Sequence, residues 1–237
     1  MNRDILVVGA GVIGCAVTYE LARRGAPVEL IDARPAGQGA TQASAGILAP
    51  YIEARETSPL LALTVCSLEL YDTFISRVST DSGLPVEYRR TGTLETTGGV
   101  VELSRLERTA EVLASRGVTA VLLDGPALRA EEPYLAEDVL GGLLIPSHGF
   151  VAAADLTRAL VVAARHRGAR VGLRPATPDE LPVIGPSHVN PRVMYATGHY
   201  RNGVLLAPLT AQLVADAMLD NRIDPLLETV SPARFGL

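Results

Sequence analysis

The stretch that decides the fold is residues 5–32, ILVVGAGVIGCAVTYELARRGAPVELID. It opens with a short run of Ile, Leu and Val, which is typical of a buried parallel strand. A glycine-rich turn follows, and Val12 to Arg24 then has helical spacing and stops at Gly25, a typical C-cap residue. A second apolar run, Pro27 to Asp32, predicts the next strand. Strand, loop, helix and strand within about 30 residues predict a βαβ unit.

The turn in this stretch carries the glycine pattern GxGxxG, at Gly9, Gly11 and Gly14. The first glycine allows a tight turn, the second lets the backbone approach a pyrophosphate, and the third lets the helix pack closely on the strand. Asp32 ends the second strand, where a carboxylate accepts hydrogen bonds from an adenosine ribose. The pattern predicts dinucleotide binding through a helix N-terminus. It does not by itself separate FAD from a nicotinamide cofactor, and a structural glycine turn is the alternative.

Composition narrows the class of protein. The chain has 237 residues, of which 48% are hydrophobic and 20% charged, with a formal net charge of -5. This is typical of a globular fold, and no basic stripe is present, so we expect no nucleic-acid partner. The apolar run from Ile5 to Tyr19 is too short to span a bilayer, which needs roughly 20 residues. We therefore expect no membrane insertion and a cytoplasmic location.

The cysteines and histidines predict neither a disulfide framework nor a metal site. Cys15 and Cys66 form no CxxC pair and are expected to be reduced thiols. No pair among His148, His166 and His188 has the spacing of metal ligands, so the sequence predicts no metal.

The rest of the chain alternates helical and extended patterns. Helices are predicted at 59–78, 102–116, 155–167 and 204–219, and strands at 86–97, 120–123, 139–145 and 193–197. Residues 174–191 hold five of the 16 prolines and are predicted to be irregular.

Three segments resemble the glycine oxidase and D-amino-acid oxidase family of FAD-dependent enzymes. TQASAGILAP, at residues 41–50, is similar to the loop that lies beside the flavin in that family. GLRPATPDELPVIG, at 172–185, and GHYRNGVLLAP, at 198–208, are similar to its C-terminal signature. The resemblance is closest to the members of thiamine biosynthesis. It implies a Rossmann-like FAD-binding domain, made of 1–80 with 150–237, and a truncated α+β substrate domain at 81–149.

The resemblance also implies an activity. A small amino acid, glycine or a D-amino acid, would lose a hydride from Cα to non-covalently bound FAD. Dioxygen would take up the electrons as hydrogen peroxide, and water would hydrolyse the imine. Relatives that pass electrons to a quinone share these motifs, so a D-amino-acid dehydrogenase is an alternative, and a nicotinamide dehydrogenase is a weaker one. A homo-oligomer is compatible with all of these.

Site residues follow from the same resemblance. The adenosine diphosphate side is expected at the glycine loop and at Val12, Ile13, Asp32 and Ala33. The flavin-side loop is expected to supply Ala40, Thr41, Ala45, Gly46 and Ile47. The turn and helix start under the isoalloxazine match His199, Tyr200, Arg201, Asn202, Gly203, Val204 and Leu205. Arg174 and Arg201 match residues that hold the substrate carboxylate, for which the guanidinium fork is suited, although each could instead be a surface arginine. No residue is identified as a general acid or base.

One departure from the family is large. Family members carry a long segment where Val171 here runs directly into Gly172. The resemblance implies that the missing segment holds further strands of both domains and an active-site tyrosine. A catalytically inactive FAD-binding remnant is therefore the rival hypothesis. In that case the strands at 86–97 and 139–145 are expected to lose their partners and to expose their edges.

Overall fold

The computed structural model describes residues 5–32, 35–53, 59–169, 179, 181–199 and 202–237. Contacts divide the chain into two compact units. The first joins Met1–Tyr88 with Val151–Leu237, and the second is Arg89–Phe150. In this division residues 81–88 belong to the first unit and Phe150 to the second, whereas the sequence prediction placed them the other way round. The functions assigned to the two domains stay predictions.

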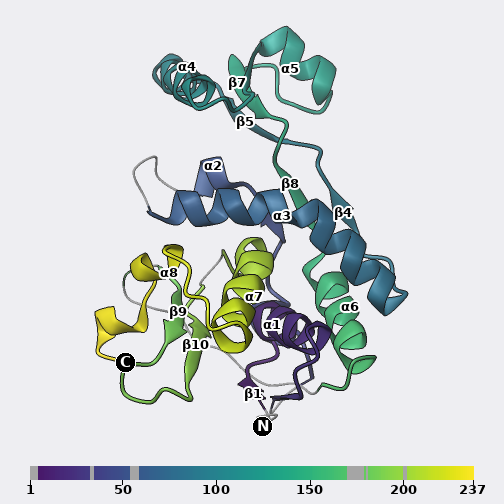
Figure 1. The fold of residues 1–237 in the computed structure, drawn as a ribbon. Coiled ribbons are helices and arrows are strands. Elements are labelled where there is room, and N and C mark those ends of the chain that lie inside the picture. The colour runs from purple at the N-terminus through teal and green to yellow at the C-terminus, as the bar shows by residue number, and fades with distance from the viewer. Residues whose placement is uncertain (1–4, 33–34, 54–58, 170–178, 180, 200–201) are drawn as a thin grey trace. The chain divides into compact units, whose positions relative to one another are not determined.

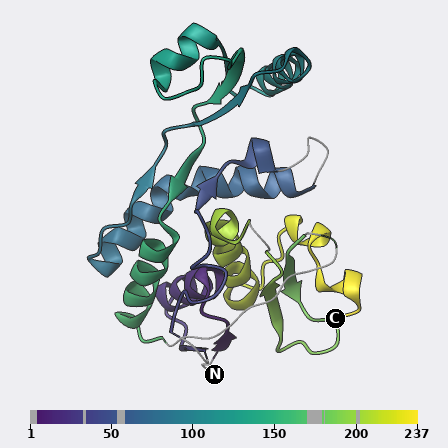
Figure 2. The ribbon, with the colours of Figure 1, turned by 180° about the vertical axis from the view of Figure 1, so that it is seen from behind.

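The first unit is built on the predicted βαβ unit (Figure 1). Strand β1 (Ile5–Val8) pairs in parallel with β2 (Val28–Ile31), and helix α1 (Val12–Arg23) connects them. Helix α1 packs against α6 (Ala153–Arg165) and α7 (Gly203–Leu219), and α3 (Pro59–Ser82) packs on both of these helices. The core therefore lies between helices that come from both ends of the sequence. Figure 2 shows α1, α6 and α7 from behind.

Short elements complete the first unit, and two of them, β4 and β8, extend into the second. A small sheet has the order β3-β8-β4, and β9 pairs antiparallel with β10. The bounds of these elements are β3 Ile47–Leu48, α2 Pro50–Glu53, β4 Tyr88–Arg89, β8 Gly149–Val151, β9 Val183–Pro186, β10 Met194–Thr197, α8 Leu226–Thr229 and a 3₁₀ turn at Pro232–Phe235. Strand β9 corrects the prediction of an irregular segment at 174–191. Its Val183 and Ile184 are β-formers that become buried, and Pro186 stands only at the strand's end.

The second unit is a three-stranded antiparallel sheet with two helices. Strand β7 (Gly141–Ile145) lies between β5 (Thr93–Thr97) and β6 (Val121–Asp124), with α4 (Val100–Ser115) and α5 (Gly125–Glu131) packed on the sheet. The expectation that the strands at 86–97 and 139–145 would lose their partners is wrong, because β5 and β7 pair with each other over five residues. Helix α5 was not predicted, and the Asp124 side chain caps it by accepting from the Ala127 N–H at 2.8 Å.

Helix α3 is the one helix in the described part of the chain that is long and apolar enough to cross a membrane. Length and composition alone are weak evidence, since core helices pass the same test. Here Leu63, Ser67, Tyr71 and Val78 are buried, in a helix that packs on α6 and α7. The predicted absence of membrane insertion stays a prediction.

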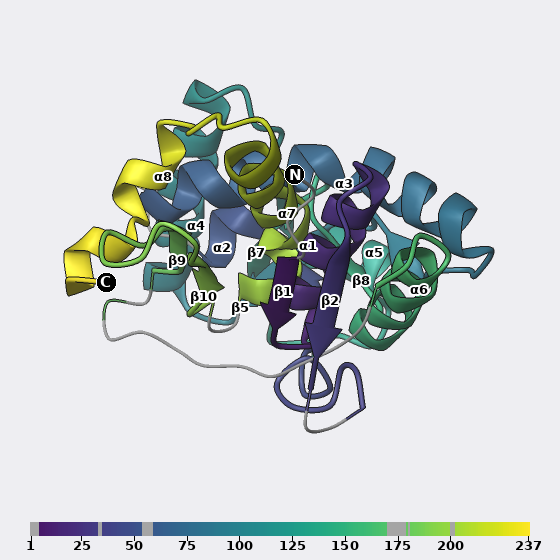
Figure 3. The same cartoon turned by 60° about the horizontal axis from the view of Figure 1, so that its bottom comes forward.

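Figure 3 shows β1 beside β2. The pair has one buried and one exposed face. Val28 and Leu30 are buried, whereas Leu6 is 58% exposed, Val8 68% and Ile31 41%. The register pairs Val8 with Ile31, so these apolar side chains share a face. Parallel sheets are normally covered on both faces. The exposed face is thus an apolar surface of the kind that favours self-association.

We expect the double variant Leu6→Thr, Val8→Thr to self-associate at least about tenfold more weakly than the unaltered chain, because it removes two exposed apolar side chains. Sedimentation velocity over a concentration series measures this. Val7→Thr is the matched control, since Val7 packs against the core and its loss should lower stability instead. Identical concentration dependence in the double variant would show that this face takes no part in association.

Candidate functional site: a dinucleotide cradle

Two of the three glycines in the loop are required by the fold itself. Gly9 has φ +124°, a conformation that L side chains rarely adopt. A Cβ on Gly14 would lie 1.6 Å from the Gly9 carbonyl oxygen, so helix and strand can approach only with glycine there. Asp32 directly follows β2, and the register of Val8 with Ile31 places it beside Gly9 at the carboxyl edge of the sheet. This is the edge at which open α/β folds bind ligands.

Gly11 is different, because the protein alone does not demand glycine there. Its φ of -67° and ψ of 174° suit any residue. A Cβ would lie 3.2 Å from Thr41 Oγ1, a side-chain atom that would have to give by a few tenths of an ångström, and it would meet no backbone atom within 4 Å. A position free of both strain and severe overlap has no structural need of glycine. A ligand that approaches the backbone here gives such a need.

The segment from Ala36 to Ala49 folds over the glycine loop. The Gly37 N–H donates to the Ala10 carbonyl at 2.8 Å, and Thr41 Oγ1 accepts from the Val12 N–H at 3.0 Å. Thr41, predicted on the flavin side, thus caps the N-terminus of α1 from 29 residues away. At the segment's far end, Gly46 has φ +70° and its Cβ would lie 1.8 Å from the Val151 carbonyl oxygen. Gly46 is therefore required by the fold.

The start of α7 comes next to the start of α1. A Cβ on Gly203 would meet His199 Cβ at 3.7 Å and Ile13 Cγ1 at 3.8 Å, which are ordinary contacts. The N-cap Asn202 is buried and its side chain makes no capping hydrogen bond. His199 is buried and its Nε2 lies 3.0 Å from Thr210 Oγ1, which fixes its ring on α7. Buried helix N-terminal N–H groups without a cap need other partners, and ligands are among these.

The other predicted residues divide by exposure. The side chains of Val12, Val204 and Leu205 are 1–3% exposed and belong to the core, so only their backbones could face a ligand. Ala45 is exposed and Ile47 is 48% exposed, so both side chains are available. Ala40 and Ile13 are half-buried. Ala33, Arg174, Tyr200 and Arg201 lie outside the described residues, and with them the whole predicted carboxylate site.

Two residues that sequence reasoning missed contact this helix start. The Tyr71 hydroxyl donates to the Val204 carbonyl, and the Ser67 hydroxyl donates to the Leu205 carbonyl. Both come from α3, more than 130 residues away along the chain. The signal that could have found them is Pro208, which leaves a helical carbonyl without its usual donor.

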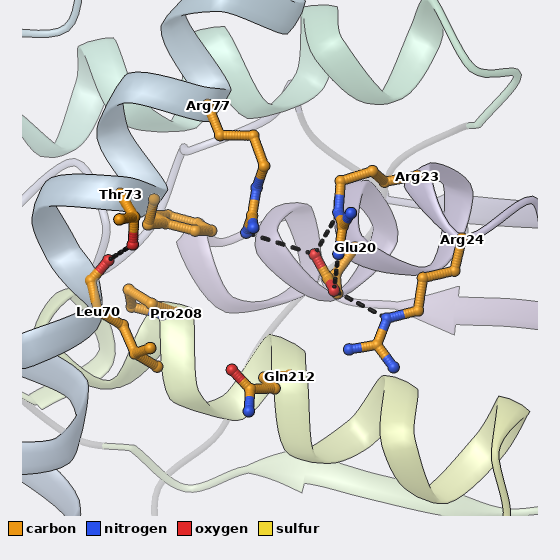
Figure 4. A pocket seen from close by; sticks show the side chains of 9 residues that line it. Glu20, Arg23, Arg24, Leu70, Thr73, Arg77, Pro208 and Gln212 are labelled. Carbon is orange, nitrogen blue, oxygen red and sulfur yellow. Dashed lines mark hydrogen bonds and ion pairs between the residues drawn. The ribbon is translucent and has the colours of Figure 1, made fainter.

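A cavity of about 110 Å³ lies near the C-terminal end of α1, the end opposite to the glycine loop (Figure 4). The buried Glu20 carboxylate accepts from Arg23 at 2.6 Å and Arg24 at 2.8 Å, with Arg77 at 3.5 Å. Burial raises the pKa of Glu20, but the hydrogen bonds from Arg23 and Arg24 outweigh it, and the net pKa lies below its usual value. The pair of Arg77 with Glu20 joins α3 to α1 and gives the cavity a structural role.

The described residues fit a dinucleotide such as FAD. At Gly11 and Gly203 the backbone is accessible, although the fold does not require glycine at either position. The N-termini of α1 and α7 lie beside these two glycines. Such termini favour the negative charge of a pyrophosphate or a reduced flavin. Within the described residues no group of three or more His, Cys, Asp or Glu side chains is placed to hold a metal ion. The absence of a metal stays a prediction.

Comparisons with known proteins agree on the family. The family model described as FAD dependent oxidoreductase matches residues 4–171 and 169–217. The bifunctional protein ThiO/ThiG of Nostoc sp. is 25% identical over 359 residues, covering 96% of this chain and 54% of that protein. Glycine oxidase of Geobacillus kaustophilus is 33% identical over 174 residues, covering 70% of this chain and 44% of the relative.

A solved structure shares the fold. The crystal structure of glycine oxidase from Geobacillus kaustophilus has a TM-score of 0.88 at 22% identity, with 96% of this chain and 97% of that chain covered. This confirms the predicted Rossmann-like α/β fold.

The comparisons also confirm that the chain is short. It spans about half the length of the curated relatives it matches. The Nostoc alignment, at 359 residues, is longer than this whole chain, so that relative holds residues without a counterpart here. The two matched ranges meet at residues 169–171, where the sequence predicted the missing segment. With the family model matching most of its residues on both sides of that junction, the chain belongs to the FAD-dependent oxidoreductases of the glycine oxidase and D-amino-acid oxidase type.

Proposed function

We propose that this chain binds FAD non-covalently in the dinucleotide cradle. The adenosine diphosphate part would lie on the glycine loop with its ribose at Asp32, and the flavin would lie toward the first turn of α7. The observation that carries the proposal is Gly11, a glycine that the fold does not require at the N-terminus of α1. The open backbone at Gly203, beside Ile13, supports the flavin end.

The cysteines support non-covalent binding. Burial, and secondarily the charge of Asp32, raise the pKa of the Cys15 thiol to about 12, so the thiol stays protonated and unreactive. Burial likewise raises the pKa of Cys66, on α3. The sequence has no cysteine after Cys66, so no thiol lies in the C-terminal segments assigned to the flavin.

We further propose that the reaction is oxidation of a small amino acid, glycine or a D-amino acid, with release of hydrogen peroxide. FAD, when bound, supplies the acceptor for a hydride. The chain's own groups would bind and orient: Arg174 and Arg201 are proposed to hold the carboxylate, and the helix starts to stabilise negative charge. We propose a cytoplasmic location without nucleic-acid or membrane partners, which the acidic balance and the core packing of α3 support.

The second candidate function is FAD binding without useful turnover. The exposed apolar face of β1 and β2 and the matched ranges that meet at 169–171 favour it. Relatives hold a segment that this chain lacks, and an active site open to water has weaker electrostatic interactions with its substrate. A third candidate within the same family is a dehydrogenase that transfers the electrons to a quinone rather than to oxygen.

The visible spectrum of the purified protein tests the proposal. We expect flavin absorption bands that acid precipitation releases into the supernatant. We expect peroxide formation from glycine, sarcosine and D-alanine far below the 1–10 per second of an ordinary oxidase. Anaerobic bleaching by one of these amines, with a quinone but not oxygen restoring the bands, would indicate a dehydrogenase.

Other results would change the conclusion. Protein that takes up no FAD in a titration would overturn the proposed cofactor site. Turnover of an ordinary oxidase would show that the missing segment is dispensable. Failure of every amine to bleach the flavin would favour the catalytically inactive FAD-binding remnant.

A further inference from the structure

Helix α7 contains a proline that disturbs the hydrogen bonds in the first turn of the helix. Pro208 lies in the sixth position of the helix and has no N–H to donate. The carbonyl four residues earlier, that of Val204, therefore lacks its helical donor, and the proline ring pushes against it. Val204 is 3% exposed, so water cannot replace the lost donor freely. A buried carbonyl without a donor destabilises the fold.

One side chain of α3 supplies the missing donor, and a second donates to the next carbonyl. The Tyr71 hydroxyl donates to the Val204 carbonyl, and the Ser67 hydroxyl donates to the neighbouring carbonyl of Leu205. Both side chains are fully buried. They lie four residues apart and thus on one face of α3. The Tyr71 ring stacks on Tyr88 at 5.9 Å between centroids, which holds the hydroxyl in place.

The two carbonyls belong to the turn that the cradle uses. The turn begins with Asn202 and Gly203, and Gly203 contacts Ile13 at the start of α1. Any rotation of this turn changes the direction of the N–H groups at the helix start. We propose that Ser67 and Tyr71 are positioning residues, which hold the first turn of α7, where Pro208 leaves a carbonyl without its helical donor, in the orientation that receives the flavin part of FAD. The inference rests on the proposed function.

A double-mutant cycle tests the link to the proline. Tyr71→Phe removes only the hydroxyl and keeps the stacked ring. Pro208→Ala restores a backbone N–H that can bond to the Val204 carbonyl. In the unaltered background we expect Tyr71→Phe to weaken FAD binding about tenfold and to lower the melting temperature of the apoprotein by about 4 °C. With Pro208→Ala present, the same change should weaken FAD binding by less than about twofold.

Flavin properties separate positioning from mere stability. We expect Tyr71→Phe and Ser67→Ala to shift the reduction potential and the visible absorption maximum of bound FAD, and Ser67→Thr, which keeps a hydroxyl, to restore both. Tyr19→Phe is the matched control. Tyr19 is also fully buried and donates to Asp81 at 2.8 Å, but it does not contact the start of α7 through its hydroxyl. It should lower stability and leave the affinity for FAD unchanged.

The outcomes are distinct. Lower stability in Tyr71→Phe and Ser67→Ala with unchanged affinity and potential would overturn the positioning role. An equal effect of Tyr71→Phe in both backgrounds would overturn the link to Pro208. An unaltered protein that binds no FAD would contradict the proposed function and this inference together. Should Pro208→Ala fail to fold, the comparison of Ser67→Ala with Ser67→Thr still decides the positioning role.

Discussion

Gly14→Ala is expected to prevent folding of the first unit, whereas Gly11→Ala is expected to fold and to lose most of its affinity for FAD. Only three positions separate the two glycines. A methyl group on Gly14 would lie 1.6 Å from the Gly9 carbonyl oxygen, and that backbone atom cannot move without separating α1 from β1. We expect a loss of more than about 4 kcal/mol of stability, the range of the most damaging single substitutions.

Gly11→Ala meets no backbone atom of this kind. Its methyl group would lie 3.2 Å from Thr41 Oγ1, and this side-chain oxygen, which accepts from the Val12 N–H, would have to give by a few tenths of an ångström. The same methyl would occupy the space that a pyrophosphate needs at the start of α1. Overpacking of about 1–3 kcal/mol corresponds to about a 5- to 150-fold loss of affinity.

Circular dichroism and an FAD titration followed by flavin fluorescence measure the two effects on the same samples. A folded Gly11→Ala protein with unchanged affinity would place the phosphates elsewhere. A folded Gly14→Ala protein would show that α1 does not need its close approach to β1. Loss of both fold and affinity in Gly11→Ala would show that the Thr41 side chain cannot move away from the added methyl group.

The sequence predicted well those features that depend on neighbours along the chain. The βαβ unit follows from Gly9, Gly11 and Gly14 between two apolar runs, and the structure places the elements within a few residues of the prediction. Gly25 also marked the end of α1 correctly. These features are local because propensity, capping and glycine conformation act over a few residues.

Features that depend on distant contacts were missed. Strand β9 lies in a proline-rich segment and becomes a strand only through pairing with β10. Tyr71 and Ser67 read as core residues of a periodic helix, and nothing near them in sequence points to the carbonyls of Val204 and Leu205. The pairing of β5 with β7 was wrongly thought lost, because the sequence comparison located the missing segment but could not show which strands had been partners.

Acidification from pH 7 to pH 5 is expected to cost the second unit about 2 kcal/mol of stability through His148. The ring is fully buried in the turn after β7, and its Nδ1 lies 2.7 Å from Thr93 Oγ1. Burial, and secondarily the charge of Arg90, lower the pKa of His148 from 6.5 to about 4. Over this pH interval His148 is therefore protonated in the unfolded chain and neutral in the folded chain.

The sign follows from that difference in proton binding. The contribution of His148 is complete above pH 6.5 and is lost as the pH falls toward about 4, where the folded protein also takes up the proton. Between pH 7 and pH 5 the effect of His148 is distinct from that of Glu20. The pKa of the Glu20 carboxyl lies below its usual value, so Glu20 titrates in more acid solution. Urea unfolding at the two pH values measures the slope.

His148→Asn removes the titrating ring while its amide can still reach Thr93. We expect this variant to be less stable at pH 7 and to lose clearly less stability than the unaltered chain on acidification. His166→Asn, at the exposed C-cap residue that follows α6, is the matched control for replacing a histidine. An unaltered slope in His148→Asn would mean that His148 is already protonated in the folded state at pH 5. The hydrogen bond to Thr93 would then have to be one that the charged ring donates.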